Sequence, residues 1–88
     1  MTLLDVVQNL DKLEAESTIY SSVPWTTNSI ALVTSEEEFK KMNRSELKYF
    51  LEIFVARDFI NDWISNSQKE FTIEEKCIRL IQYAITDA

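Results

Sequence analysis

Apolar residues recur at helical spacing at both ends of the chain. From Leu3 to Glu14, and again from Ile73 to Thr86, apolar positions three and four residues apart alternate with polar ones. That period places the apolar side chains on one side of a helix, so the pattern predicts a helix over each segment. The expected buried faces are Leu3, Val6, Val7, Leu10 and Leu13 in the first helix, and Ile73, Cys77, Leu80, Ile81 and Ala84 in the last.

Between these helices the chain changes character. Residues 18–22 and 30–34 are rich in β-branched and apolar residues, which favour strands. The intervening segment holds Pro24, which cannot donate to a strand ladder, and Asn28, which tolerates a left-handed turn. The pattern predicts a β-hairpin with a long loop. Because a lone hairpin is marginal, it must pack on helices or pair with another chain.

Two more helices are expected after the hairpin. A short one covers about Ser35 to Met42, and a long central one covers about Arg44 to Ser65. The long helix has one apolar seam along its length, formed by Tyr49, Ile53, Ala56, Ile60 and Trp63. Its first half has a second apolar face, formed by Leu47, Phe50, Leu51, Phe54 and Val55. We expect the first helix and the hairpin to cover this second face; otherwise it is a dimer or partner interface.

Helix starts are marked by a capping side chain three residues before a carboxylate. The pairs are Thr2 with Asp5, Ser35 with Glu38, Asn43 with Glu46, and Thr72 with Glu75. The expected fold class is therefore α+β: an N-terminal helix, a β-hairpin, a short helix, a long central helix and a C-terminal helix. Residues 1–88 are expected to form one compact domain, since the chain is short.

The amino-acid composition excludes the most common kinds of catalytic site. The chain has no His and no Gly, and it has one Cys. Without His there is no Ser-His-Asp triad or Cys-His pair, and without Gly there is no phosphate-binding loop of the usual kind. Asp58 and Asp62 share a helix face but lack a third ligand, and Cys77 lies on a predicted core face. We therefore expect no enzyme, no cofactor and no metal.

The net charge of the chain limits the classes of partner that it is expected to bind. The formal net charge is −6, from 9 basic and 15 acidic residues. An acidic surface disfavours nucleic acid and anionic membranes, because both are negatively charged. The first residues carry no basic segment typical of a signal peptide, and a single Cys suits a reducing compartment. We therefore expect a cytoplasmic protein whose partner is another protein or a second copy of itself.

The candidate partner-binding residues are Trp25, Glu36, Glu37 and Glu38. Trp25 follows Pro24 in the hairpin loop and has the properties of a rigid aromatic anchor. The competing interpretation is that its ring folds back over a thin core. The three glutamates open the short helix and present negative charge to a basic surface. The competing interpretation is that these acidic residues are solvated and stabilise the helix start through the helix dipole.

Three stretches of the chain carry a resemblance to a known family. They are Thr18-Ile19-Tyr20 with Pro24-Trp25-Thr26, the run from Tyr49 to Ala56, and the ending from Glu74 to Ala84. Together they resemble a family of small uncharacterised bacterial proteins, a domain of unknown function. Ser35 to Asn43 lack the Gly-containing segment of that family. The resemblance implies a bacterial cytoplasmic α+β domain and no particular activity.

Three functions of different classes follow. The first is a small acidic protein-binding module, such as an immunity protein or antitoxin that neutralises a basic toxin or enzyme by occlusion. The second is a homodimeric structural or regulatory domain. The third is a minimal enzyme or metal protein that uses carboxylates, Tyr and Lys. Size, charge and the missing catalytic groups favour the first.

Overall fold

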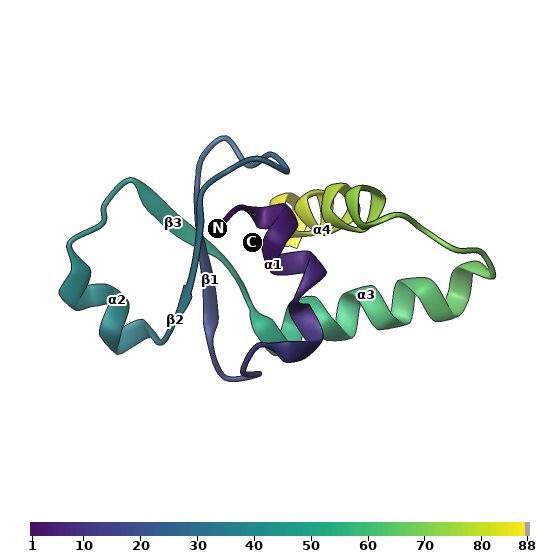
Figure 1. Ribbon diagram of the computed structural model, residues 1–88, viewed down its shortest axis with the longest axis horizontal. Coiled ribbons are helices and arrows are strands. Elements are labelled where there is room, and N and C mark those ends of the chain that lie inside the picture. The colour runs from purple at the N-terminus through teal and green to yellow at the C-terminus, as the bar shows by residue number, and fades with distance from the viewer. Residues whose placement is uncertain (88) are drawn as a thin grey trace.

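The computed structural model describes residues 1–87 and shows an α+β fold (Figure 1). This part of the chain holds four α-helices, a short 3₁₀ helix (η1) and one three-stranded sheet. In chain order they are α1 (Leu3–Gln8), η1 (Leu10–Lys12), β1 (Thr18–Ser22), β2 (Ala31–Thr34), α2 (Glu36–Met42), β3 (Leu47–Glu52), α3 (Ile53–Ser67) and α4 (Ile73–Asp87). The predicted fold class is confirmed.

The sheet is antiparallel, with strand order β2-β1-β3. The predicted hairpin is present, with Ile19 opposite Val33 and Tyr20 opposite Leu32. On the other side of β1 the register shifts, because Ile19 pairs with Leu51 whereas Tyr20 pairs with Tyr49. Phe50 is thus an extra residue in β3, which is the geometry of a β-bulge. The third strand gives the hairpin the support that it needs within its own chain.

The long central helix begins later than the sequence pattern predicts. Residues 47–52 form β3, and α3 begins only at Ile53. A short apolar run has no periodicity that separates a strand from a buried helix. The free edge of β1 decides between them, because β3 satisfies backbone groups that β1 otherwise exposes. The supposed second helical face is therefore divided: Leu47, Phe50 and Leu51 are buried strand residues, and only Phe54 of α3 remains markedly exposed.

The main core lies on one face of the sheet, which we call the inner face. Figure 1 shows α1, α3 and α4 on this side and α2 alone on the other. Ile19 and Leu51 point inward from register partners and join the buried side chains of the three helices. The cluster includes Leu3, Val6, Val7, Leu10, Phe50, Ile53, Ala56, Ile60, Cys77, Leu80, Ile81 and Ala84. Burying this apolar surface is the main stabilising term.

Arg57 ties α3 to the N-terminal segment. Its guanidinium group donates to the backbone carbonyl oxygen of Leu10 at 2.8 Å and to that of Leu13. The first helix is shorter than predicted, since α1 ends at Gln8 and η1 covers only three further residues. Arg57 thus adds a second donor to the Leu10 carbonyl oxygen, which also accepts from the Leu13 N–H at 3.4 Å, and it supplies a donor to the Leu13 carbonyl oxygen at the end of η1.

Three of the four predicted capping pairs are present. The Thr2 and Thr72 hydroxyls accept from the backbone N–H groups of Asp5 and Glu75, whose carboxylates accept in return. Ser35 accepts from the N–H of Glu38 at 3.1 Å. The fourth pair is wrong, because Asn43 ends α2 in a left-handed conformation with φ of 54°. Asn adopts this conformation readily, so the same side chain serves a helix end as well as a start.

Candidate functional site

The opposite, outer face of the sheet carries a second group of aromatic and polar residues. Side chains alternate along a strand, so Thr18 and Tyr20 point away from Ile19 and the main core. Their register partners on β3 are Glu52 and Tyr49. Register partners share a face, so four side chains from two strands gather on this surface.

Helix α2 covers part of the outer face through one side chain. The ring of Phe39 stacks flat on Tyr20, with ring centroids 3.6 Å apart and an interplanar angle of 3°. No residue of α2 is fully buried. Tyr49 remains 48% exposed on the same surface. One short helix therefore leaves much of this face open.

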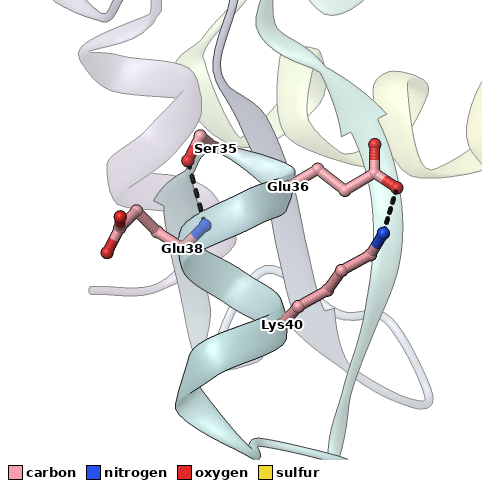
Figure 2. A network of polar contacts seen from close by, with 4 residues as sticks. All are labelled: Ser35, Glu36, Glu38 and Lys40. Carbon is pink, nitrogen blue, oxygen red and sulfur yellow. Dashed lines mark hydrogen bonds and ion pairs between the residues drawn. The ribbon is translucent and has the colours of Figure 1, made fainter.

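A cleft of about 580 Å³ lies between α2 and the outer face. Three aromatic residues, of which two are tyrosines, line it together with three carboxylates, one threonine hydroxyl and one ammonium group. These residues are Glu16, Thr18, Tyr20, Glu36, Phe39, Lys40, Tyr49 and Glu52. The formal charge of the lining is −2, since one Lys offsets one of three Glu. The Lys40 ammonium group lies 3.5 Å from the Glu36 carboxylate, and both side chains are largely exposed (Figure 2).

The negative lining acts on the two tyrosines. Burial, and secondly the Glu36 carboxylate, raise the pKa of Tyr20 above its ordinary value. Burial, and secondly Glu52, likewise raise the pKa of Tyr49. The Tyr49 hydroxyl donates to the Glu52 carboxylate at 3.4 Å, a long hydrogen bond. Both tyrosines therefore stay neutral at physiological pH, and their rings lie in a field that attracts cations.

The structure separates the three predicted glutamates. Glu36 lines the cleft, whereas Glu37 and Glu38 do not. Figure 2 shows Glu36 and Glu38 on different sides of α2. The Glu38 carboxylate lies 3.7 Å from the Lys41 ammonium group, in an exposed ion pair. Glu38 also follows the Ser35 cap, so the acidic run serves the start of the helix as well as the surface.

Trp25 lies in the loop that precedes β2, whereas α2 begins just after the same strand (Figure 1). Its ring packs edge-on against Phe50, with ring centroids 4.8 Å apart. The indole Nε1 is buried and has no hydrogen-bond partner. The ring thus folds over the main core, and the length of β2 separates it from the acidic start of α2.

Sequence reasoning missed most residues of the cleft. The sequence pattern predicts a helix over Tyr49 and Glu52, and a helix there does not bring them beside Tyr20 and Thr18. Glu16 lies between the helix predicted over residues 3–14 and the strand predicted over residues 18–22, where the pattern predicts no element. One signal was available: in a strand interpretation of residues 47–52, Tyr49 and Leu47 fall on one side and Lys48 on the other. A third strand beside the hairpin would have brought an aromatic pair onto its outer face.

Other candidate chemistry is inert or dispersed. Burial raises the pKa of the Cys77 thiol to about 11, so it stays protonated near neutral pH. Asp58 and Asp62 are both exposed on α3. Within residues 1–87, no three His, Cys, Asp or Glu side chains come together in a way that could hold a metal ion. Among the helices described, none is both long and apolar enough to cross a membrane.

Comparison of the chain with protein-family models, with curated proteins and with solved structures gave no match. The resemblance to a family of small bacterial proteins therefore stays a prediction.

Proposed function

We propose that this chain is a small acidic protein-binding module that neutralises a basic toxin or enzyme by occluding it. The observation that supports this most is the acid-lined aromatic cleft on the outer face. It combines an aromatic surface with an excess of carboxylates, and it belongs to a chain of net charge −6. Negative charge of this kind steers a basic partner toward the surface and raises the rate of encounter.

A protein that neutralises its partner by occlusion needs a surface complementary in shape and charge, and it needs no catalytic group. The inner face supplies a packed core, so the outer face is held on a rigid scaffold. A partner's basic surface docks over β1, β3 and α2, and exposed aromatic area such as Tyr49 contributes contact. We place this interaction in the cytoplasm, where the Cys77 thiol stays reduced.

The second candidate is the homodimeric domain. It is favoured by Ile78 and Ile85, which are 50% and 64% exposed and lie seven residues apart on α4. That spacing puts both on one stripe of the helix. The edge of β2 offers less to a second copy, because the Met1 carbonyl oxygen already accepts from the Ala31 N–H at 2.8 Å.

The test compares three tagged baits in lysate of the cells that make the protein. One is the unaltered chain, and the cleft variant replaces three lining carboxylates by amides: Glu16→Gln, Glu36→Gln and Glu52→Gln. The control variant removes the same number of carboxylates from exposed positions outside the cleft and outside α2: Asp58→Asn, Asp62→Asn and Glu70→Gln. Each variant loses three negative charges and moves the formal charge from −6 to −3.

A basic protein captured in stoichiometric amount by the unaltered chain and the control, and lost from the cleft variant, supports the proposal. Mass spectrometry identifies it, and light scattering gives the mass of the complex. Equal capture by both variants contradicts a role for the cleft. A doubled mass with no partner contradicts neutralisation as the function and favours the homodimer.

A further inference from the structure

The aromatic rings of the cleft are not equally available to a ligand. Phe39 covers one face of Tyr20, and Tyr20 itself is buried. Tyr49 stands beside Tyr20 in the register and is 48% exposed. Its hydroxyl group lies next to the Glu52 carboxylate, and Glu16 lines the same cleft. The open part of the site is thus an aromatic ring with carboxylates around it.

This combination selects a cation. A positive group over a Tyr ring is attracted by the ring quadrupole, and carboxylates add charge-assisted hydrogen bonds. An anion is disfavoured here, because the three carboxylates of the lining outweigh its single ammonium group, that of Lys40. The volume of about 580 Å³ is large enough for a long side chain rather than for single water molecules.

Between the two cationic side chains, the geometry favours arginine. A guanidinium group is flat, weakly hydrated and carries five N–H donors in one plane, so it stacks on a ring while it donates sideways. An ammonium group is a strongly hydrated point charge. Lys40 of the cleft is an example of an ammonium group that stays hydrated. It pairs with Glu36, yet its side chain remains 72% exposed.

We infer that the cleft binds an arginine side chain of the partner, which stacks on Tyr49 and forms hydrogen bonds with Glu16 and Glu52. We call this binding position the arginine seat. This inference rests on the proposed function and specifies the chemistry that the partner must bring. It also implies that the anchor of the complex is supplied by the partner, whereas this chain supplies the receiving pocket.

The test is an NMR titration of the full ¹⁵N-labelled chain with three blocked pentapeptides in low salt. Each peptide is alanine apart from a central arginine, lysine or citrulline, the last being neutral and close in shape to arginine. The arginine peptide should shift the amides of Thr18, Tyr20, Tyr49 and Glu52 in a saturable way, with a Kd on the order of 1 mM. Citrulline should bind at least about tenfold more weakly, because it has no charge to pair.

Three variants locate the binding. Glu52→Gln should weaken the arginine peptide about fivefold, as expected for one exposed ion pair. Tyr49→Leu should weaken it by a similar factor, whereas Tyr49→Phe keeps the ring and should bind almost as well as the unaltered chain. Glu70→Gln is the control, since Glu70 is exposed and does not line the cleft. The spectrum of each free variant shows that it is folded.

Three outcomes of the titration would overturn the arginine seat. They are amide shifts with the citrulline peptide equal to those with the arginine peptide, equal affinity for the lysine peptide, and shifts of amides outside the cleft. The lysate experiment fails or succeeds separately. A basic partner that binds the Glu52→Gln chain as tightly as the unaltered chain removes the arginine seat and leaves the proposed function. Arginine binding in the cleft, with no partner captured from cells, keeps the seat and removes the proposed function.

Discussion

The two faces of the sheet differ in what packs against them. The inner face meets three helices, and each of them contributes fully buried side chains to one core. The outer face meets only α2, which has no buried residue and contributes the half-exposed ring of Phe39. A small domain can bury only a limited apolar surface, and in this fold most of the buried apolar side chains lie on the inner face. The outer face is thereby left open, acidic and aromatic, and we propose that a partner binds there.

The largest expected effect comes from the inner face. Phe50 is 1% exposed, sits at the β-bulge and contacts Trp25. Phe50→Ala leaves a cavity under the sheet, so it should lower the free energy of unfolding by about 3–5 kcal/mol. Urea denaturation followed by circular dichroism measures the change. A loss below about 1 kcal/mol would mean that the inner face is not the main source of stability.

The matching change on the outer face should cost less. Phe39→Ala removes the ring that stacks on Tyr20, but Phe39 is only half-buried and lies outside the main core. We expect a loss of about 1–2 kcal/mol in the same urea experiment, from one aromatic pair and partial burial. A loss as large as that of Phe50→Ala would erase the distinction between the two faces.

A cap on the inner side offers a smaller, local change. The Thr72 hydroxyl accepts from the Glu75 N–H at 3.1 Å and so starts α4, which carries Cys77 and Leu80 into the core. Thr72→Ala should lower the free energy of unfolding by about 1 kcal/mol. Thr72→Ser keeps the hydroxyl and is the control. Equal losses in both variants would show that the hydroxyl does not act as a cap.

Acid should weaken the same helix starts. Hydrogen bonds from Thr2 hold the pKa of Asp5 below its ordinary value, and those from Thr72 do the same for Glu75. The unfolded chain therefore takes up protons at these carboxyls at a higher pH than the folded chain does. Their contribution is complete above the unfolded pKa values and is lost as the pH falls through the lower, folded ones. Urea midpoints measured from pH 6 down to pH 3 should decrease; a midpoint that rises on acidification contradicts the assignment.

The sequence predicts the elements of this fold that depend on local pattern, but not the strand β3, which depends on pairing with the distant strand β1. The hairpin, α2 and α4 follow from local pattern, and capping marks Thr2, Ser35 and Thr72 as helix starts. Residues 47–52 have an apolar run without a decisive period, and only the free edge of β1 makes them a strand. The cleft depends on that pairing, because it places Tyr49 beside Tyr20. The acidic start of α2 was therefore visible in the sequence, but the aromatic surface that it adjoins was not.

The most direct test of the contrast between the faces is the unfolding free energy of the cleft variant with Glu16→Gln, Glu36→Gln and Glu52→Gln. In the structure these carboxylates make one exposed ion pair and accept one long hydrogen bond, so they add little to stability. We propose that these carboxylates serve binding rather than folding, so the variant should match or exceed the stability of the unaltered chain, within about 0.5 kcal/mol of it or above. A loss of about 2 kcal/mol or more would contradict this, because it would show that the carboxylates hold the fold together.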